Sequence, residues 1–393
     1  MKVCFVTESI FSFGGVQRVT AVIAKELAKT AEVTVMTFDQ PESKDTSLYE
    51  LCDAPINYEF LKYPEVGAIK QKCCKAYSFL YRRVLPQNDI TSALYSHSSF
   101  PSERRQLLIN RLNAKDHEAI IAVHAPIVTR LAAIRSSLRC QNLIGWIHNS
   151  FEAMFAKESW YAGKELERYF VYQFRRLTHT VVLCHCDAAS YRQRYGFSPE
   201  VIYNPLTVIP GKPNNGQSNK FLAVGRFSPR HKGFDLLIKA FARFCENNSD
   251  WTLDIVGEGP EADLYQQLIA QYHLEKRITI HPFTNNIQAY YSNAQVYVLS
   301  SRWEGFGLVL VEAMAHGLPV VSSDLPTSRE IMGDFGLYFP NGETEALAQR
   351  LTEATTLDWQ AKSTQAQQIA AHFNIETIIN QWQQLIKKAS DKA

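Results

Sequence analysis

The chain lacks the features that mark membrane-spanning and secreted proteins. It has no uninterrupted apolar run of about 18 residues, the length that a membrane-spanning helix needs. Its start, MKVCFV, carries one lysine before a short strand-like run, which does not match a signal peptide. Its eight cysteines are scattered without the spacing of a small disulfide-rich domain. We therefore expect a cytoplasmic protein with reduced thiols.

The length and composition favour a soluble protein of two domains. A chain of 393 residues is too long for one ordinary hydrophobic core. The hydrophobic fraction of 46% and the charged fraction of 20% are typical of globular proteins. A segment rich in Pro, Gly and Asn, 205–219, has the composition of a linker. We expect one domain over 1–205 and a second from 206 to about 374.

Short apolar runs alternate with helical patterns on both sides of this linker. Such βαβ repetition predicts an α/β fold of two doubly wound Rossmann-like domains, and we expect the ligand cleft between them. The expected strands are 2–7, 32–38, 118–123, 142–148, 179–184 and 200–204 in the first domain, and 220–224, 251–256, 277–281, 294–299 and 318–322 in the second.

The segment 301–315, SRWEGFGLVLVEAMA, joins an expected strand to an expected helix. Gly305 and Gly307 let backbone amides approach a ligand, and the following helix directs unpaired N–H groups to the same place. Glu304 and Glu312 are eight residues apart, about two helical turns along one face. Carboxylates accept hydrogen bonds from sugar or ribose hydroxyls. Each glutamate could instead be only a solvated acid favoured by the helix dipole.

A second glycine turn carries basic residues. The stretch GRFSPRHKGFD ends strand 220–224, and Arg226 and Lys232 within it could clamp a diphosphate, although either could be a surface charge. Gly257 and Gly259 fit a dinucleotide fingerprint. Two nearby acids, Glu258 and Glu261, would oppose a pyrophosphate, so this is a weak signal for NAD.

Histidines and cysteines offer further candidates. His124 and His148 follow expected strands, and His148 has the better position for a site, whereas we regard His231 as incidental. Cys184 and Cys186 have the residue types of a metal site. At the end of a strand, however, they would point to opposite faces, which favours a structural role.

Basic residues are concentrated between 62 and 115. This stretch has ten basic and three acidic residues, with Tyr77, Phe79, Leu80 and Tyr81 among the bases. A basic helix with an aromatic face can lie on anionic lipid. It could equally be a surface helix whose apolar stripe packs on the core. Nucleic acid is a weaker interpretation because no binding motif accompanies the charge.

Five motifs together resemble a known family. In order and spacing, GGVQR, WIHNS, VIYNPL, GRFSPRHKGFDLLIKAF and EGFGLVLVEAMAHGLPVV are similar to the retaining GT-B nucleotide-sugar glycosyltransferases with an E-x7-E motif. The resemblance covers nearly the whole chain. It implies that the closing helix, about 375–393, packs back on the first domain.

The resemblance also implies roles for individual residues. Arg226 and Lys232 would neutralise the donor diphosphate, Glu304 would contact the transferred sugar, Glu312 would hold the ribose hydroxyls and His148 would approach the sugar. These residues, rather than a metal, would stabilise the leaving group, because no Asp-x-Asp motif is present. The other donor-binding residues that it implies are Gly15, Pro282, Phe283, Gly305, Phe306, Gly307, Leu308 and Val309.

The resulting hypothesis is a retaining hexosyltransferase with no cofactor and no metal. It would move a hexose or N-acetylhexosamine from a UDP-sugar to a glycan acceptor, lipid-linked or not, in bacterial surface polysaccharide, lipopolysaccharide or teichoic acid synthesis. The 62–115 region would contact the inner face of the plasma membrane. Two alternatives stay open: a nucleotide-sugar epimerase on the same fold, and a non-catalytic partner subunit.

Overall fold

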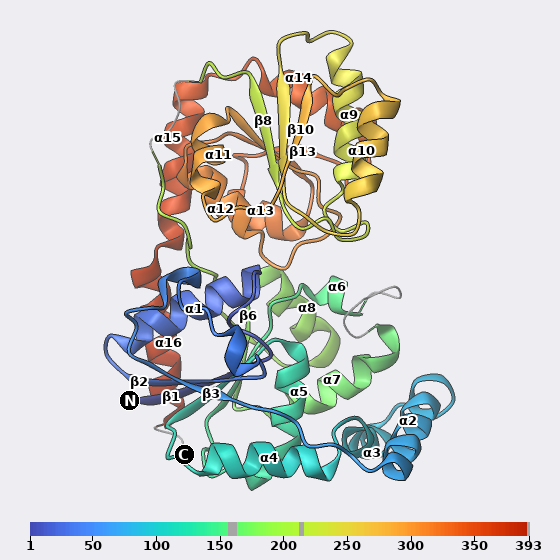
Figure 1. Cartoon of the computed structure of the whole chain (residues 1–393), viewed down its shortest axis with the longest axis vertical. Coiled ribbons are helices and arrows are strands. Elements are labelled where there is room, and N and C mark those ends of the chain that lie inside the picture. Colours follow the sequence, from blue (N-terminus) through green and yellow to red (C-terminus); the bar gives the residue numbers. More distant parts are fainter. Residues whose placement is uncertain (156–162, 212–215, 391–393) are drawn as a thin grey trace. The chain divides into compact units, whose positions relative to one another are not determined.

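The computed structural model describes residues 1–155, 163–211 and 216–390. Residues 212–215 of the expected linker and 391–393 of the expected closing helix lie outside this description. The described chain forms two compact domains. The N-terminal domain comprises 1–203 with the chain from 378 onward, and the C-terminal domain comprises 204–377 (Figure 1).

The N-terminal domain is built on a seven-stranded parallel sheet with the order β3-β2-β1-β4-β5-β6-β7. Its strands are β1 (Lys2–Thr7), β2 (Glu32–Thr37), β3 (Ile56–Phe60), β4 (Ala119–Val123), β5 (Leu143–Trp146), β6 (His179–Val182) and β7 (Glu200–Val201). Its helices are α1 (Gly15–Ala28), α2 (Ala68–Arg83), α3 (Asp89–Ser99), α4 (Ser102–Asn113), α5 (Ala125–Ile134), α6 (Phe151–Phe155), α7 (Glu167–Phe174), α8 (His185–Tyr195) and α16 (Ile375–Ser390), which belongs to this domain from Ile378.

The C-terminal domain repeats the same design on a six-stranded parallel sheet, order β10-β9-β8-β11-β12-β13. Its strands are β8 (Lys220–Val224), β9 (Thr252–Val256), β10 (Ile278–His281), β11 (Val296–Leu299), β12 (Val320–Ser323) and β13 (Leu337–Phe339). Its helices are α9 (Phe234–Cys245), α10 (Ala262–Gln271), α11 (Ile287–Asn293), α12 (Leu308–Ala315), α13 (Pro326–Met332), α14 (Thr344–Ala354) and α15 (Trp359–Ala370).

The central strands form where the sequence is apolar on both faces of the sheet. All five residues of β4 are buried, and so are all four of β11, because helices cover both sides of a parallel sheet. Helix α9 shows the matching helical pattern, burying Phe234, Leu237 and Phe241 on one side. This confirms the predicted α/β fold of two doubly wound domains.

Two edge strands were not predicted. In β3, only Ile56 is fully buried, and β13 has three residues. An edge strand needs no continuous apolar run, because one of its sides is not paired within the sheet. Both edges therefore lack the sequence pattern that identifies the central strands.

Each sheet has one point at which the strand order reverses. In the N-terminal domain the chain runs outward through β1, β2 and β3 and then returns to β4 on the other side of β1. The C-terminal domain does the same between β8 and β11. Crevices at the carboxyl ends of strands at such points are where open α/β sheets bind ligands.

Helix α16 is held in the N-terminal domain by its apolar stripe. Trp382 is fully buried, and its ring meets Trp146 edge-on with the ring centroids 4.8 Å apart. Asn142 Nδ2 donates to the carbonyl of Ile386 at 3.2 Å. In the part of the chain that the structure describes, no helix combines the length and the apolar character needed to cross a bilayer.

Candidate functional site

Two loops meet at the reversal point of the C-terminal sheet. One follows β8 and spans 225–233, and the other follows β11 and spans 300–307. Gly233 makes their approach possible, since a Cβ on it would lie 2.1 Å from the carbonyl oxygen of Ser300. Its φ of 63° is also in the left-handed region that favours glycine. The glycine thus allows the two loops to pack backbone to backbone.

His231 joins the same two loops. Its Nε2 lies 2.9 Å from the carbonyl oxygen of Trp303, and the two rings stack with their centroids 4.8 Å apart. Burial lowers the pKa of His231, and the neighbouring Lys232 lowers it further. The imidazole is therefore neutral at pH 7, and its Nε2–H donates to the carbonyl. The sequence did not predict this structural role of His231, whose ring connects residues 72 positions apart in the chain.

A buried ion pair lies between these loops. Lys232 Nζ and Glu304 Oε1 are 2.7 Å apart, and their side chains are only 12% and 7% exposed. Ser301 Oγ donates to the same oxygen at 2.5 Å. Burial acts to raise the pKa of Glu304, but the charge of Lys232 and these hydrogen bonds outweigh it, so the pKa falls below its ordinary value. The carboxylate is therefore ionised at neutral pH.

Glu312, on α12, is held in place by two hydroxyl groups. It is 1% exposed. Tyr291 Oη donates to Oε2 at 2.9 Å, and Thr207 Oγ1 donates to Oε1 at 3.2 Å. Each carboxylate oxygen can accept a further hydrogen bond. Sequence reasoning missed Ser301, Tyr291 and Thr207, whose residue types are common, and only their contacts identify them.

Both carboxylates act on one buried tyrosine. The Oη of Tyr297 donates to the carbonyl of Val224 at 3.4 Å. Its pKa is raised well above 10, first by burial and then by the negative charges of Glu304 and Glu312. The two glutamates that the sequence singled out are therefore both close enough to Tyr297 to affect its ionisation.

The predicted geometry of the two glutamates needs one correction. Helix α12 begins at Leu308, so Glu304 lies in the preceding loop and the two-turn helical spacing does not apply to it. Gly307 is the N-cap residue, with a φ of 83°. The amide of Leu310 donates to the carbonyl of Gly307 at 2.8 Å, so the earlier amides of the first turn, those of Leu308 and Val309, are the ones that can bind an anion.

The glycines of the dinucleotide fingerprint serve the neighbouring loop instead. A Cβ on Gly257 would lie 1.9 Å from the carbonyl oxygen of Gly225, and one on Gly259 would lie 2.6 Å from that of Phe227. The amide of Phe227 donates to the carbonyl of Glu258 at 2.8 Å. These glycines make room for the loop that begins with Gly225 and Arg226, where Arg226 is exposed.

The remaining donor-binding candidates of this domain lie on the same edge of the sheet or within the loop after β11. Pro282 and Phe283 directly follow β10, two strands from the reversal point, and the Phe283 ring is 43% exposed. Phe306 is 3% exposed, and its ring meets Phe373 at 5.7 Å. Gly305, which precedes Phe306, is partly exposed.

The reversal point of the N-terminal sheet carries Gly15 and His124. Gly15 opens α1, and Asp39 holds the loop before it by accepting from the amides of Ile10 and Phe11 at 2.8 and 3.2 Å. His124 caps α5 with a φ of 72°, which is uncommon outside glycine. The loops here are therefore tightly constrained.

His148 follows the neighbouring strand β5. It is 7% exposed and packs its ring 4.3 Å from that of Trp146. Burial lowers its pKa well below the ordinary 6.5, and His124 lowers it further. Among the described residues its Nε2 has no hydrogen-bond partner. A neutral ring with one unpaired nitrogen can exchange a hydrogen bond with a ligand hydroxyl.

The two neighbouring cysteines are arranged differently from our expectation. Strand β6 ends at Val182, so Cys184 is the N-cap of α8 and Cys186 lies in its first turn. Their sulfurs are 2.9 Å apart instead of pointing to opposite faces. The change from strand to helix between the two residues turns both side chains to one side.

Two family models together match most of this chain. Residues 13–208 match the model described as Glycosyltransferase Family 4, and residues 208–372 match the one described as Glycosyl transferases group 1. The chain belongs to the GT-B glycosyltransferases. The first match ends and the second begins at residue 208, close to the start of the C-terminal domain at residue 204.

Individual relatives of this glycosyltransferase match over shorter stretches. An uncharacterised glycosyltransferase of Haemophilus influenzae is 38% identical over 31% of this chain and 34% of its own. The amylovoran biosynthesis glycosyltransferase AmsD of Erwinia amylovora is 30% identical over 43% of this chain and 48% of its own. The alignments thus span between a third and a half of these relatives. The structure of Anabaena Alr3699/HepE with UDP and glucose has a TM-score of 0.71 at 21% identity, covering 99% and 100% of the two chains.

Proposed function

We propose that this glycosyltransferase transfers a hexose or N-acetylhexosamine from a UDP-sugar to a glycan acceptor, with retention of the anomeric configuration. The observation that carries the proposal is the buried Lys232–Glu304 pair at the reversal point of the C-terminal sheet. It joins a cation suited to phosphate with a carboxylate suited to sugar hydroxyls. The fold neighbour that holds UDP and glucose, and the relative in amylovoran synthesis, support the choice of donor and of acceptor class.

The diphosphate would be held by side chains and backbone amides of the C-terminal domain. Arg226 and Lys232 come from the loop after β8, and the first-turn amides of α12 come from the loop after β11. Lys232 has three donor hydrogens, so it can keep one on Glu304 and direct another at a phosphate oxygen. As the leaving group departs it gains negative charge, and these donors stabilise that charge without reorganising.

The two glutamates would orient the sugar and the ribose. Glu304 is ionised and within reach of Lys232, so in this proposal it accepts from a hydroxyl of the transferred sugar next to the phosphates. Glu312, fixed by Tyr291 and Thr207, would accept from the ribose hydroxyls. Pro282 and Phe283 would lie against the base, and the backbone around Gly305, Phe306 and Gly307 would lie against the sugar and phosphates.

Retention would follow from attack on the face that the leaving group occupies. The bond from the anomeric carbon to the β-phosphate oxygen breaks, and a bond to the acceptor oxygen forms on the same face. The acceptor proton passes to the departing phosphate oxygen, so no enzyme nucleophile is needed. His148, neutral and with an unpaired Nε2, would contact the sugar, and Gly15 would let the first loop of the N-terminal domain approach a phosphate.

Ligand binding to the full chain tests the donor assignment. Thermal unfolding is measured with UDP, GDP, ADP, NAD and a panel of UDP-sugars. A ligand at about 100 times its Kd adds roughly 2.7 kcal/mol to the folded state. We expect stabilisation by UDP and by one UDP-sugar. A response to NAD alone would overturn the proposal.

Product analysis then tests the reaction. With the stabilising UDP-sugar and a set of glycan acceptors, we expect a glycoside of unchanged anomeric configuration and one UDP for each sugar transferred. Arg226→Ala and Glu304→Gln should lose transfer, while Arg243→Ala, which removes an exposed arginine paired with Glu345 at 2.8 Å, should keep it. An epimerised nucleotide-sugar formed without acceptor would identify an epimerase, and full transfer by both site variants would refute the site.

A further inference from the structure

Helix α2 of the N-terminal domain carries an apolar stripe that faces away from its neighbours. Ile69, Cys73, Ala76 and Leu80 follow one another at spacings of four and three residues, so they share one side of the helix. All four are exposed, Ile69 by 81% and Leu80 by 42%. Val84, directly after the helix, continues the stripe and is 68% exposed.

The inward side of α2 is a different one. Of its 16 residues only Tyr81 is buried. The Tyr81 ring stacks on Tyr95 of α3 at 4.4 Å, and its hydroxyl lies 2.8 Å from that of Ser92. Tyr77 donates from its hydroxyl to the carbonyl of Thr91 at 3.2 Å. The tyrosines thus attach α2 to α3, and no element among the described residues covers the aliphatic stripe.

Helix α3 repeats this arrangement. Ile90 and Leu94, one turn apart, are 75% and 52% exposed. The buried residues of α3, Ser92, Tyr95 and Ser96, lie on the opposite side of the helix. Six of the eleven large hydrophobic side chains that are exposed in the described chain fall between 69 and 94. Figure 1 shows α2 and α3 as a hairpin away from the sheet of their domain. Such clustering is uncommon on a protein surface that contacts only water.

The hairpin is strongly basic on α2. Residues 68–84 contain five lysines and arginines and no acidic residue. Lys70 pairs with Glu103 at 2.7 Å. Within the part of the chain that the structure describes, Lys72, Lys75 and Arg83 have no ion-pair partner. Of these three, Lys72 and Arg83 flank the apolar stripe.

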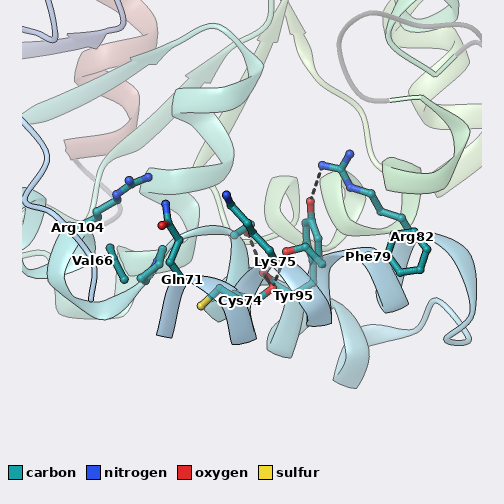
Figure 2. Close-up of a pocket in the computed structure, with 12 residues that line it drawn as sticks. Val66, Gln71, Cys74, Lys75, Phe79, Arg82, Tyr95 and Arg104 are labelled. Carbon is teal, nitrogen blue, oxygen red and sulfur yellow. Dashed lines mark hydrogen bonds between the residues drawn. The ribbon is translucent and has the colours of Figure 1, made fainter. Parts of the chain in front are cut away.

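A groove of about 490 Å³ runs beside α2 and adds to this charge. Lys75, Arg82 and Arg104 line it, and none of its lining residues is acidic. Figure 2 shows Arg82 donating to the hydroxyl of Tyr95 and Phe79 beside it. Phe79 is 63% exposed. By helical spacing, Lys75 and Arg82 lie a third to a half of a turn around α2 from Ile69 and Leu80, so the groove opens on another side of the helix than the stripe.

We propose that the α2–α3 hairpin docks this protein on an anionic lipid bilayer. The aliphatic stripe of α2 and the exposed pair on α3 insert among the lipid headgroups, and the lysines and arginines of α2 contact the lipid phosphates. This inference rests on the surface alone and is independent of the donor site in the C-terminal domain.

Charge decides between a bilayer and a second copy of the chain. A two-fold dimer brings the same patch of both subunits together. Here that would place Lys72 and Arg83 of one α2 against those of another, with no acid in either copy of the helix, which is unfavourable. An anionic bilayer satisfies the apolar stripe and the charges at the same time.

Vesicle flotation with the full chain tests the proposal. The probes are vesicles of phosphatidylcholine alone and vesicles with about one third phosphatidylglycerol, whose anionic headgroups carry the phosphate. We expect binding to the anionic vesicles only, weakened by raised salt. Each basic residue near such a surface contributes about a fivefold gain in affinity. Lys72→Gln with Arg83→Gln should therefore lower the affinity by about 25-fold.

Matched variants distinguish binding through this surface from nonspecific binding to vesicles. Ile69→Ser with Leu80→Ser should lower the affinity at least about tenfold. Leu264→Ser with Tyr272→Ser removes side chains of α10 and its C-terminus that are 41% and 37% exposed, and should change nothing. The charge control replaces three exposed lysines elsewhere by Gln: Lys276, Lys387 and Lys388.

Three outcomes would overturn the proposal. One is that the native chain does not bind anionic vesicles, and another is that both hairpin variants co-float with these vesicles as strongly as the native chain does. The third is a concentration-dependent dimer in sedimentation that Ile69→Ser with Leu80→Ser abolishes, which would assign the surface to a second copy. UDP binding, measured in parallel, should be unchanged in all hairpin variants. A failure here is thus distinct from a failure of the proposed transfer reaction.

Discussion

Neutralising Glu304 while keeping its shape isolates the energy of the buried pair. Glu304→Gln retains an oxygen that can accept from Ser301 and leaves Lys232 buried without a counter-charge. Because the two side chains are 7% and 12% exposed, the scale for buried pairs applies, and we expect a loss of about 3 kcal/mol. Lys232→Met should cost a similar amount. The double variant leaves no unpaired charge and should lose only about 1 kcal/mol.

Hydrogen exchange measures this in the right domain. The two domains can unfold separately, so a single unfolding transition of the whole chain is ambiguous. Exchange followed by mass spectrometry on peptides from β11 and α12, at rising urea, reports the stability of the C-terminal domain alone. The matched control is Asp324→Asn, which breaks a pair with Arg329 of the same 2.7 Å length but 41% and 48% exposed. It should cost less than about 1 kcal/mol.

The double variant decides the outcome. If its loss equals the sum of the two single losses, the charges do not interact and the pair carries no coupling energy. A cost of Asp324→Asn as large as that of Glu304→Gln would likewise refute the reasoning, because burial would not then be the cause. Recovery in the double variant, with transfer still lost, would show that the pair is retained for the donor rather than for stability.

Three further predictions concern the same domain. The pKa of Glu304 is lowered in the folded state. Its contribution to stability is therefore complete above about pH 4.3, where an unfolded glutamate titrates, and is lost as the pH falls through the lower pKa of the folded state. Glu304→Gln should remove this part of the acid dependence of urea unfolding. Gly233→Ala should lower the free energy of urea unfolding by about 2–4 kcal/mol and weaken UDP binding, because the new Cβ would meet the backbone of Ser300. The control Gly342→Ala, at a φ of 89° with nothing within 4 Å of the new Cβ, should lower it by about 1–2 kcal/mol in the same urea experiment. Tyr291→Phe should raise the Kd for UDP, measured by calorimetry, by about tenfold, because Glu312 loses a charge-assisted hydrogen bond.

Burial shows which residues of α2 meet the protein and which meet solvent. Its composition predicts an amphipathic basic helix, but composition does not say which side meets the protein. The large side chains divide: Tyr81 packs in the core of the domain with Tyr77 against it, whereas Phe79 and Leu80 are exposed. The helix thus packs its tyrosines on the core and leaves an aliphatic stripe exposed, and membrane contact stays a prediction. The exposed stripe of α2 that contains Ile69 and Cys73 was not predicted from the sequence, because its residues are few and are separated by lysines.

The local sequence pattern was sufficient to predict an element wherever several consecutive residues meet the same requirement, such as burial. The buried central strands, the linker after Asn204 and the stripe of α16 could be predicted because burial on both faces, chain reversal and helical spacing each leave a repeated signal. Glu304, Glu312 and Lys232 were singled out because glycine turns after strands are typical of ligand sites, and their roles in binding the donor stay predictions. The edge strands β3 and β13 leave no such signal.

Tertiary structure alone decided which distant groups meet. The 2.7 Å pair of Lys232 and Glu304, the loop connection by His231 and the hydroxyls on Glu312 join segments between 21 and 105 residues apart. No local pattern encodes such contacts, because they depend on how parallel strands are ordered in a sheet. The sequence by itself determined that this protein has two α/β domains with glycine turns, basic residues and acids at strand ends. The strand order, reversing between β8 and β11, brought those residues into one site.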